Sequence, residues 1–316
     1  MLKVEENVDI SIYKYENQAV KEKTFLFRDN GGFFSKIIKN FFKVSTVIIS
    51  DPILKDNKLL DENLNVDNAI LLHGLNGSAD STYIKGMVNL FLKNNCRVFC
   101  MNARGIKNIC KTKNLAHIGH TDDLKLLVEH VLREYKGSIF IIGFSQGANW
   151  CTKYLGENCA HSRIKGAVSV CNPFNFNLLK QMVPFTGIFN RIVHYGMAKV
   201  YTTYLNKLLG EIVSGKNVHE INMKLRNMKV LTHNSLEEFY EESSSTNYIQ
   251  NINVPLLFIS AEDDPLIPIA VIPKDKITKN RNTGLILLKG GHLGFRSLFL
   301  RSSIEGIVEQ FYKKLN

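Results

Sequence analysis

The chain has 316 residues, 45% of them hydrophobic and 22% charged, so it can bury a sizeable core without disulfide or metal crosslinks. Its 40 Lys and Arg residues outnumber 29 acidic ones, which gives a formal charge of +11 and an attraction to anionic surfaces. The sequence contains neither an arginine-rich recognition helix nor an aromatic RNA-binding motif. We therefore expect no nucleic acid as a partner and favour peripheral association with an anionic membrane.

The six cysteines lack CxxC or other metal-ligand spacing, and several lie in apolar stretches, as reduced core cysteines do. The charged N-terminal residues 1–17 lack the apolar core of a signal peptide. Both features favour a reducing compartment, so we expect a cytoplasmic protein.

One apolar segment near the N-terminus, Phe33–Ser50, is interrupted by Lys36, Lys39 and Lys43. On a helix these lysines would share one face, with Phe and Ile on the other. The lysines break up the run of about 18 apolar residues that a membrane-spanning helix needs. We interpret the segment as an amphipathic element packed on the core, and interfacial anchoring to a membrane is the alternative.

From Asn68 onward, short apolar strands alternate with helices. The expected strands are Ala69–His73, Arg97–Met101, Ser138–Ile142 and Gly166–Val170, and the expected helices are Ser81–Lys93, Thr121–Tyr135 and Gln146–Glu157. Such alternation predicts an α/β fold with a mostly parallel, doubly wound sheet.

The alternation stops after residue 174. Residues 175–250 have a mostly helical pattern, and the strand–helix order then resumes with Pro255–Ser260, Gly284–Leu288 and Ile304–Leu315. Because both parts must share one sheet, we predict a single domain over residues 1–316, with a helical cap or lid inserted at about 175–250. Apolar residues at the start of this insertion predict a pocket for an acyl chain: Phe174, Phe176, Leu178, Leu179, Phe185, Ile188 and Phe189.

The motif GFSQG, Gly143–Gly147, directly follows an expected strand and opens an expected helix. A serine on such a tight strand-to-helix turn is held in a strained conformation, and small neighbours make the turn possible. Gly143 and Gly147 supply that space. Ser145 would then project from the carboxyl end of the sheet at a helix N-terminus, where a developing oxyanion is stabilised. We predict that Ser145 is a catalytic nucleophile.

A serine nucleophile needs a base and an orienting carboxylate, and in this arrangement the chain order is Ser, then Asp or Glu, then His. Asp264 follows the strand PLLFIS, and His292 follows the strand GLILL. Both therefore lie at carboxyl ends of strands, where ligands bind in open α/β sheets. Glu262 and Asp263 compete with Asp264 for the acid role. We choose Asp264 from its spacing to Pro268, with Asp263 as the alternative.

Two backbone N–H groups are expected to bind the oxyanion of the tetrahedral intermediate. One belongs to Gln146, the residue after the nucleophile, and the other to Leu75 in the turn HGLNG. We expect His73 to shape that turn. His117 and His120 lack a third ligand at convincing spacing, so we interpret them as structural or pocket-lining and predict no metal site.

The chain resembles the embryogenesis-associated, YheT-like branch of the α/β-hydrolases over residues 68–295. The resemblance rests on HGLNGSADSTYI, NARG (Asn102–Gly105), HTDDL (His120–Leu124), GFSQGANWCTKYLGE, GAVSVCNPFNF (Gly166–Phe176), VPLLFISAEDDPLIP and GGHLGF. It implies an α/β-hydrolase fold and a serine esterase or lipase acting on lipid esters. It also implies that Ser145, Asp264 and His292 form the triad and that the segment after Phe176 is the lid. No metal or organic cofactor is implied.

The chain departs from this pattern at Gln146, where the family usually has Leu or Met. The elbow GFSQG with Gln is also that of acyl-protein thioesterases, and His117–Asp122 fits an H-x4-D acyltransferase pattern. A thioesterase or an alcohol acyltransferase with the same triad is therefore an alternative to an esterase. A peptidase and a hydrolase-fold binding protein without activity are further alternatives.

Overall fold

The computed structural model describes residues 12–15, 18–27, 43–50, 65–106, 116–158, 161–182, 187–210, 212–295 and 303–316. Of the segment Phe33–Ser50, the last eight residues form strand β3 (Lys43–Ser50), and the rest lies outside the described residues. Among the described residues no helix is long and apolar enough to cross a membrane.

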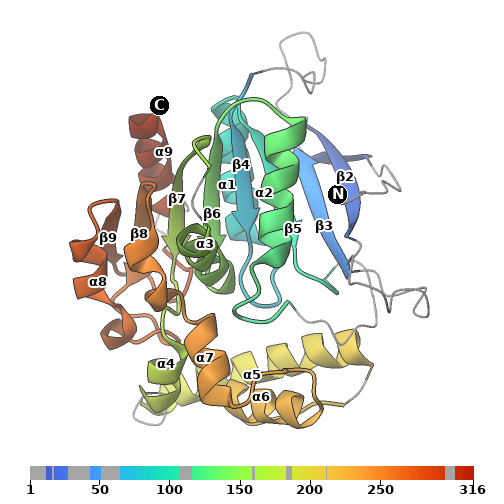
Figure 1. Cartoon of the computed structure of the whole chain (residues 1–316), viewed down its shortest axis with the longest axis vertical. Coiled ribbons are helices and arrows are strands. Elements are labelled where there is room, and N and C mark those ends of the chain that lie inside the picture. Colours follow the sequence, from blue (N-terminus) through green and yellow to red (C-terminus); the bar gives the residue numbers. More distant parts are fainter. Residues whose placement is uncertain are drawn as a thin grey trace.

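A nine-stranded sheet runs through the molecule in the order β1-β2-β3-β5-β4-β6-β7-β8-β9 (Figure 1). The strands β5, β4, β6, β7, β8 and β9 pair in parallel, whereas β1 to β3 are antiparallel and extend the edge at β5. The bounds are β1 Ile12–Tyr15, β2 Gln18–Phe27, β4 Asn68–Leu72, β5 Arg97–Asn102, β6 Ile139–Phe144, β7 Ile164–Val170, β8 Leu256–Ala261 and β9 Thr283–Leu288. The predicted α/β class with a mostly parallel sheet is confirmed.

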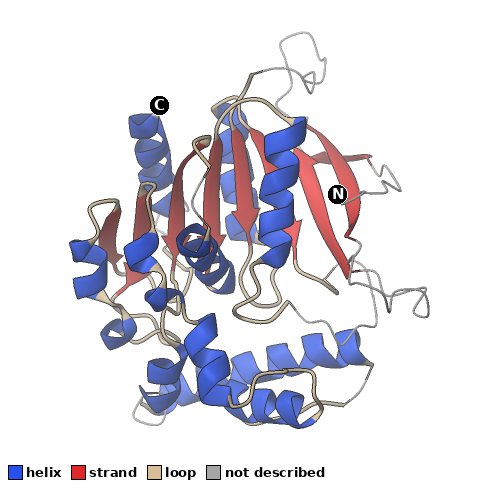
Figure 2. Cartoon of the chain, viewed as in Figure 1, coloured by secondary structure: helices blue, strands red, loops and turns tan. Residues whose placement is uncertain are grey.

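Helices cover both faces of the parallel strands (Figure 2). On one face lie α1 (Thr82–Lys93) and α9 (Ser303–Leu315), and on the other lie α2 (Asp122–Glu134), α3 (Gln146–Glu157) and α8 (Lys274–Lys279). Strand β4 shows why the parallel strands are continuous apolar segments in the sequence. Its alternate residues Ala69 and Leu71 pack toward α1, while Ile70 and Leu72 pack toward α2 and α3.

In the part of the chain that the structure describes, four α-helices lie between β7 and β8, beyond the carboxyl ends of the strands (Figure 1). They are α4 (Phe176–Met182), α5 (Ile188–Leu209), α6 (Val218–Asn227) and α7 (Leu236–Ser243), and we refer to them as the helical insertion. Ala198, Leu205, Ile221 and Leu225 belong to a small apolar core of the insertion itself. The predicted insertion at about 175–250 falls on these helices. Its action as a lid and the single-domain assignment stay predictions.

The cysteines in the described part of the chain, Cys96, Cys100, Cys151 and Cys171, are free and buried. Burial raises the pKa of each of these thiols, so they remain neutral and behave as small core residues. Cys110 and Cys159 lie outside the described residues.

Candidate active site

Ser145 connects β6 to α3 in a backbone conformation that non-glycine residues rarely adopt, with φ 52° and ψ −113°. Gly143 and Gly147, two residues before and after Ser145, are needed because other backbone segments pass close to them. A Cβ atom on Gly143 would lie 2.2 Å from the carbonyl oxygen of Gly147, and one on Gly147 would lie 2.5 Å from that of Leu72. The motif GFSQG therefore forms the sharp strand-to-helix turn that its spacing predicts.

The structure brings the three predicted catalytic side chains into one hydrogen-bonded series. His292 Nε2 lies 3.0 Å from Ser145 Oγ, and His292 Nδ1 lies 2.8 Å from Asp264 Oδ2. The other carboxylate oxygen of Asp264 accepts hydrogen bonds from the N–H groups of Leu266 and Ile267 at 2.8 and 3.0 Å. The carboxylate is thus buried and fixed in orientation, and it faces one side of the imidazole while the serine faces the other.

The three neighbouring acidic residues after β8 have different surroundings. Asp264 contacts His292, whereas Asp263 Oδ1 accepts hydrogen bonds from the N–H groups of Gly290 and Gly291 at 2.8 and 2.9 Å. These bonds lower the pKa of Asp263 and hold the turn that leads into His292. Glu262 is exposed. Judged by these contacts, Asp264 lies where the carboxylate that orients the histidine is expected. Asp263 instead holds the loop that carries His292.

The turn HGLNG is held by His73, as the sequence predicts. Its Nδ1 donates to the carbonyl oxygen of Gly74 at 2.6 Å, and its Nε2 accepts from the N–H of Ala103 at 3.0 Å. Burial lowers the pKa of His73 to about 4, so the ring is neutral near pH 7 and can make both bonds. Tyr83 adds a contact that the sequence did not indicate, because its hydroxyl accepts from the N–H of Gly74 at 3.1 Å.

The two predicted oxyanion donors, Leu75 and Gln146, line the same cavity as Ser145. Gln146 is the first residue of α3, so its N–H has no acceptor within the helix. The Gln146 side chain donates to the carbonyl oxygen of Ala116 at 3.3 Å. Of the two donors that Gln146 carries, the backbone N–H is therefore the one that can bind an oxyanion.

A cavity of about 320 Å³ extends from Ser145 and His292 toward the helical insertion. Most of its lining surface is apolar and comes from Leu75, Ile118, Pro173, Phe176, Leu179, Met197, Val218, Leu266 and Ile267, which are half of the lining residues. Of the apolar residues expected to form an acyl pocket, Phe176 and Leu179 line it, while Phe174 is buried in the main core. Phe185 and the side chains of Ile188 and Phe189 lie outside the description.

Cys171, Asp264 and His292 offer three potential metal ligands within 4.8 Å of one another. Asp264 and His292 are already bonded to each other, however, and burial raises the pKa of the Cys171 thiol. Because a metal would need the thiolate, this group fits a metal poorly.

The motifs NARG and HTDDL meet in a buried ion pair. Arg104 Nε donates to Asp123 Oδ2 at 2.8 Å, and Arg104 Nη2 lies 2.8 Å from His120 Nε2. Burial opposes ionisation of Asp123, but hydrogen bonds and charges from His120 and Arg104 prevail and hold its pKa well below the usual range. From α5, Tyr204 donates to the carbonyl oxygen of Arg104 at 2.8 Å. His120 thus lies against the ion pair, and the bond from Tyr204 joins the insertion to the loop that follows β5.

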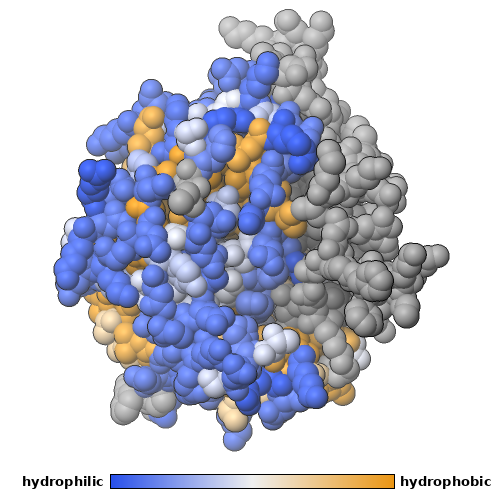
Figure 3. All heavy atoms as spheres, viewed as in Figure 1, coloured by the Kyte–Doolittle hydropathy of each residue, from blue (hydrophilic) through white to orange (hydrophobic). Residues whose placement is uncertain are grey.

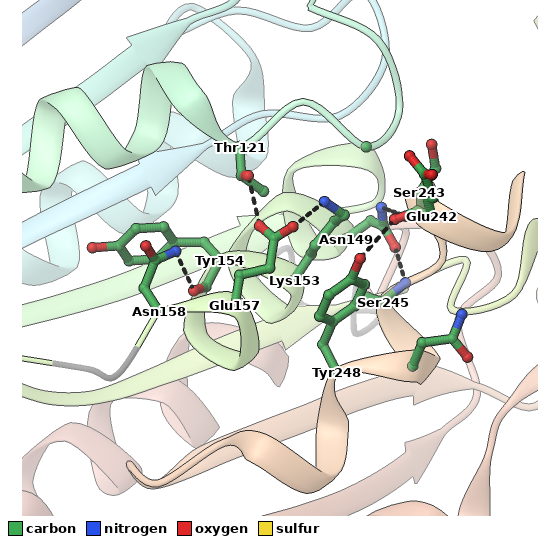
Figure 4. A network of polar contacts seen from close by, with 12 residues as sticks. Thr121, Asn149, Lys153, Tyr154, Glu157, Asn158, Glu242, Ser243, Ser245 and Tyr248 are labelled. Carbon is green, nitrogen blue, oxygen red and sulfur yellow. Dashed lines mark hydrogen bonds and ion pairs between the residues drawn. The ribbon is translucent and has the colours of Figure 1, made fainter. Parts of the chain in front are cut away.

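Asn149, one turn beyond Ser145 on α3, fixes the end of the helical insertion. Its Nδ2 donates to the carbonyl oxygens of Ile118 and Ser243, both at 2.8 Å, and its Oδ1 accepts from the N–H of Ser245 at 3.1 Å. Figure 4 shows Asn149 facing Ser243 and Ser245, beside the contacts of Lys153 with Glu157. The helix that begins at the serine turn thus carries one anchor of the insertion.

A family model described as alpha/beta hydrolase fold matches residues 70–296. The embryogenesis-associated protein EMB8 of Picea glauca is 30% identical over 241 residues, which cover 72% of this chain and 52% of that protein. The monoacylglycerol lipase ABHD2 of Danio rerio is 29% identical over 251 residues, covering 72% of this chain and 59% of that protein. The chain thus spans between half and two thirds of the length of these relatives.

Among solved structures, the esterase Pf2001 of Pyrococcus furiosus superposes with a TM-score of 0.51 over 99% of this chain and 93% of that one. Only 18% of the aligned residues are identical, so this likeness supports the fold alone.

Proposed function

The chain belongs to the alpha/beta hydrolase fold family, and from this membership we propose that it is a serine carboxylic-ester hydrolase acting on lipid esters. The observation that carries the proposal is the hydrogen-bonded series Ser145–His292–Asp264 at the mouth of an apolar cavity. Lipid substrates are favoured by the apolar lining and by a relative named monoacylglycerol lipase.

The proposed reaction is acyl transfer in two steps. His292 Nε2 accepts the hydroxyl proton as Ser145 Oγ attacks the ester carbonyl carbon, and the N–H groups of Leu75 and Gln146 bind the oxyanion. Asp264 keeps the proton of His292 on Nδ1 and stabilises the imidazolium. The intermediate collapses, the alcohol leaves with the proton from His292, and an acyl-enzyme remains. Water, deprotonated by His292, then releases the carboxylic acid.

Hydrolysis of p-nitrophenyl esters with acyl chains of increasing length tests this proposal. We expect wild type to cleave them with a preference for medium or long chains, and Ser145→Ala to lose activity. Added alcohols that capture the acyl group would indicate an acyltransferase, and selective cleavage of acyl thioesters would indicate a thioesterase. Wild-type protein that cleaves neither class would contradict the proposal.

We also propose that the outer face of the helical insertion meets an anionic lipid surface. Ile192 and Ile212 are 63% and 91% exposed, and Tyr195 is half-exposed on the same helix as Ile192. Arg191 and Lys199 are exposed next to Ile192 and Tyr195 on α5, and Ile212 lies in the loop after that helix. In Figure 3, apolar residues reach the surface among hydrophilic ones at the lower side, where the insertion lies.

Exposed apolar side chains with basic neighbours are typical of interfacial contacts. Co-sedimentation with vesicles tests this surface. We expect stronger binding when phosphatidylserine is added to phosphatidylcholine, and weaker binding for Ile192→Asp. Equal sedimentation of both proteins with both vesicles would contradict the membrane contact.

A further inference from the structure

The turn that carries the predicted oxyanion donor Leu75 is fixed by hydrogen bonds to both backbone polar groups of Gly74. The N–H of Gly77 donates to the carbonyl oxygen of Gly74 at 2.9 Å, and His73 Nδ1 donates to the same oxygen at 2.6 Å. On the other side, the N–H of Gly74 donates to the hydroxyl of Tyr83 at 3.1 Å. Gly74 is therefore held both through its carbonyl and through its N–H group.

The orientation of Gly74 determines the direction of the Leu75 N–H. In a planar trans peptide, the carbonyl oxygen of Gly74 and the N–H of Leu75 point in opposite directions. The carbonyl oxygen faces His73 and Gly77, so the N–H faces away from them. This N–H makes no backbone hydrogen bond within the described part of the chain, and Leu75 lines the cavity beside Ser145. The contacts of Gly74 therefore orient a donor that lies next to the nucleophile.

The close approach of the turn to Ser145 explains why such contacts are needed. A Cβ atom on Gly74 would lie 3.2 Å from the Cβ of Ser145, which is tight for a side chain. Glycine fits this space, but it adopts more backbone conformations than other residues, so it does not by itself hold its two peptide planes in one orientation. His73 holds the plane that follows Gly74, and Tyr83 holds the plane that precedes it.

Tyr83 contacts both the turn and the strand that leads into the nucleophile. It is the second residue of α1, and its ring packs on Phe144, the last residue of β6, with ring centroids 4.8 Å apart. Burial raises the pKa of Tyr83, so its hydroxyl stays neutral near pH 7. Tyr83 lies outside the lining of the cavity, so it influences the reaction through the turn and not by touching the substrate.

We propose that Tyr83 is a positioning residue for the oxyanion: its hydroxyl fixes the N–H of Gly74, and this bond keeps the Leu75 N–H directed at the reacting carbonyl oxygen. This inference rests on the proposed ester hydrolase function. The tetrahedral intermediates of acylation and deacylation both carry an oxyanion at this place, so loss of the bond slows both steps. Binding of the uncharged ester precedes the oxyanion and changes little.

Tyr83→Phe tests the inference, because it removes the hydroxyl and keeps the ring on Phe144. With p-nitrophenyl decanoate we expect kcat to decrease about tenfold and KM to stay within about twofold, since acylation and deacylation slow together. The matched control is Tyr312→Phe, which removes a buried hydroxyl that donates to Asp67 at 2.9 Å, at the amino end of β4. At equal folded concentration, the control should keep kcat within about twofold of wild type.

Two inhibitors distinguish positioning of the oxyanion from a general structural role. Decyl trifluoromethyl ketone forms a bond from its carbonyl carbon to Ser145 Oγ while the serine proton passes to His292, and its carbonyl oxygen becomes an oxyanion. Decyl methyl ketone has the same chain but is not activated for this addition. In Tyr83→Phe, we expect the inhibition constant of the trifluoromethyl ketone to rise about tenfold and that of the methyl ketone to stay within about twofold.

An unchanged kcat in folded Tyr83→Phe would overturn the inference alone, and so would an equal loss of affinity for both ketones. If Tyr83→Phe does not fold, Gly77→Ala decides, because a Cβ on Gly77 would lie 2.6 Å from the Tyr83 hydroxyl oxygen and displace it from Gly74. That variant should show the same loss of kcat and of trifluoromethyl ketone affinity, and wild-type values in it would overturn the inference. Wild-type protein that cleaves no ester and is not inhibited by the trifluoromethyl ketone would overturn the proposed function as well.

Discussion

At the scale of single residues, two adjacent carboxylates in the site have different surroundings and different contacts. Asp264 is buried against the imidazole, whereas Asp263 is exposed and bonds to the backbone of the turn before His292. Adjacent residues in an extended or turn segment point in different directions, so only one of them can reach the histidine. The sequence limits the candidates for the catalytic acid to three neighbouring acidic residues. Only their contacts in the folded structure distinguish one from another.

Substitution of the two aspartates should therefore have unequal effects. Asp264→Asn leaves the wrong hydrogen-bonding partner for His292 Nδ1 and should lower kcat by about 10³- to 10⁴-fold. Asp263→Ala removes only a loop contact and should lower kcat by about tenfold or less. Ester hydrolysis by both variants, at matched folded concentration, checks the comparison. A larger loss for Asp263→Ala would reverse the assignment.

The neutral, buried His73 should make the protein less stable in mild acid. Its folded pKa of about 4 is below the usual value of 6.5, so the unfolded chain binds more protons between these values and stability falls as pH decreases through this window. The contribution of His73 should decrease by about 1 kcal/mol between pH 6 and pH 5.

Urea unfolding at both pH values measures this change. His73→Gln cannot gain a proton, so its unfolding free energy should decrease correspondingly less. Equal decreases for wild type and variant would contradict the assignment of a neutral, buried ring to this position.

At the scale of elements, the turn between β6 and α3 is the part of the site that the sequence specifies best. Its expected strand ends at Ile142, but β6 continues to Phe144, because these residues pair with β7 up to Val170. Ser145 thus follows the strand directly. Such boundary differences arise because pairing with a neighbouring strand, which local sequence does not encode, extends an element.

Alanine at two glycines should have opposite effects on stability. Gly143→Ala places a Cβ 2.2 Å from backbone, which cannot move without distorting the turn, and we expect a loss of about 2 kcal/mol or more. Gly196 lies within α5, and a Cβ there meets nothing within 4 Å. Gly196→Ala should therefore stabilise by about 0.5–1 kcal/mol. Thermal unfolding of both variants tests this, and a Gly143→Ala protein as stable as wild type would refute the packing argument.

At the scale of the whole molecule, the sequence predicts the fold and the location of the site because both depend on order along the chain. Ser145, Asp264 and His292 each follow a strand, and parallel strands bring their carboxyl ends to one edge. Tyr83 could not be predicted in the same way, because its contact with Gly74 depends on how α1 lies against the sheet.

The central claim is that Ser145 is a nucleophile activated by His292. It is tested most directly by reaction with a fluorophosphonate, followed by mass spectrometry of the digested protein. We predict a single phosphonylated peptide that contains Ser145, no labelling of Ser145→Ala, and much slower labelling of His292→Ala. Wild-type protein that remains unlabelled, or that is labelled equally in the Ser145→Ala variant, would contradict the account.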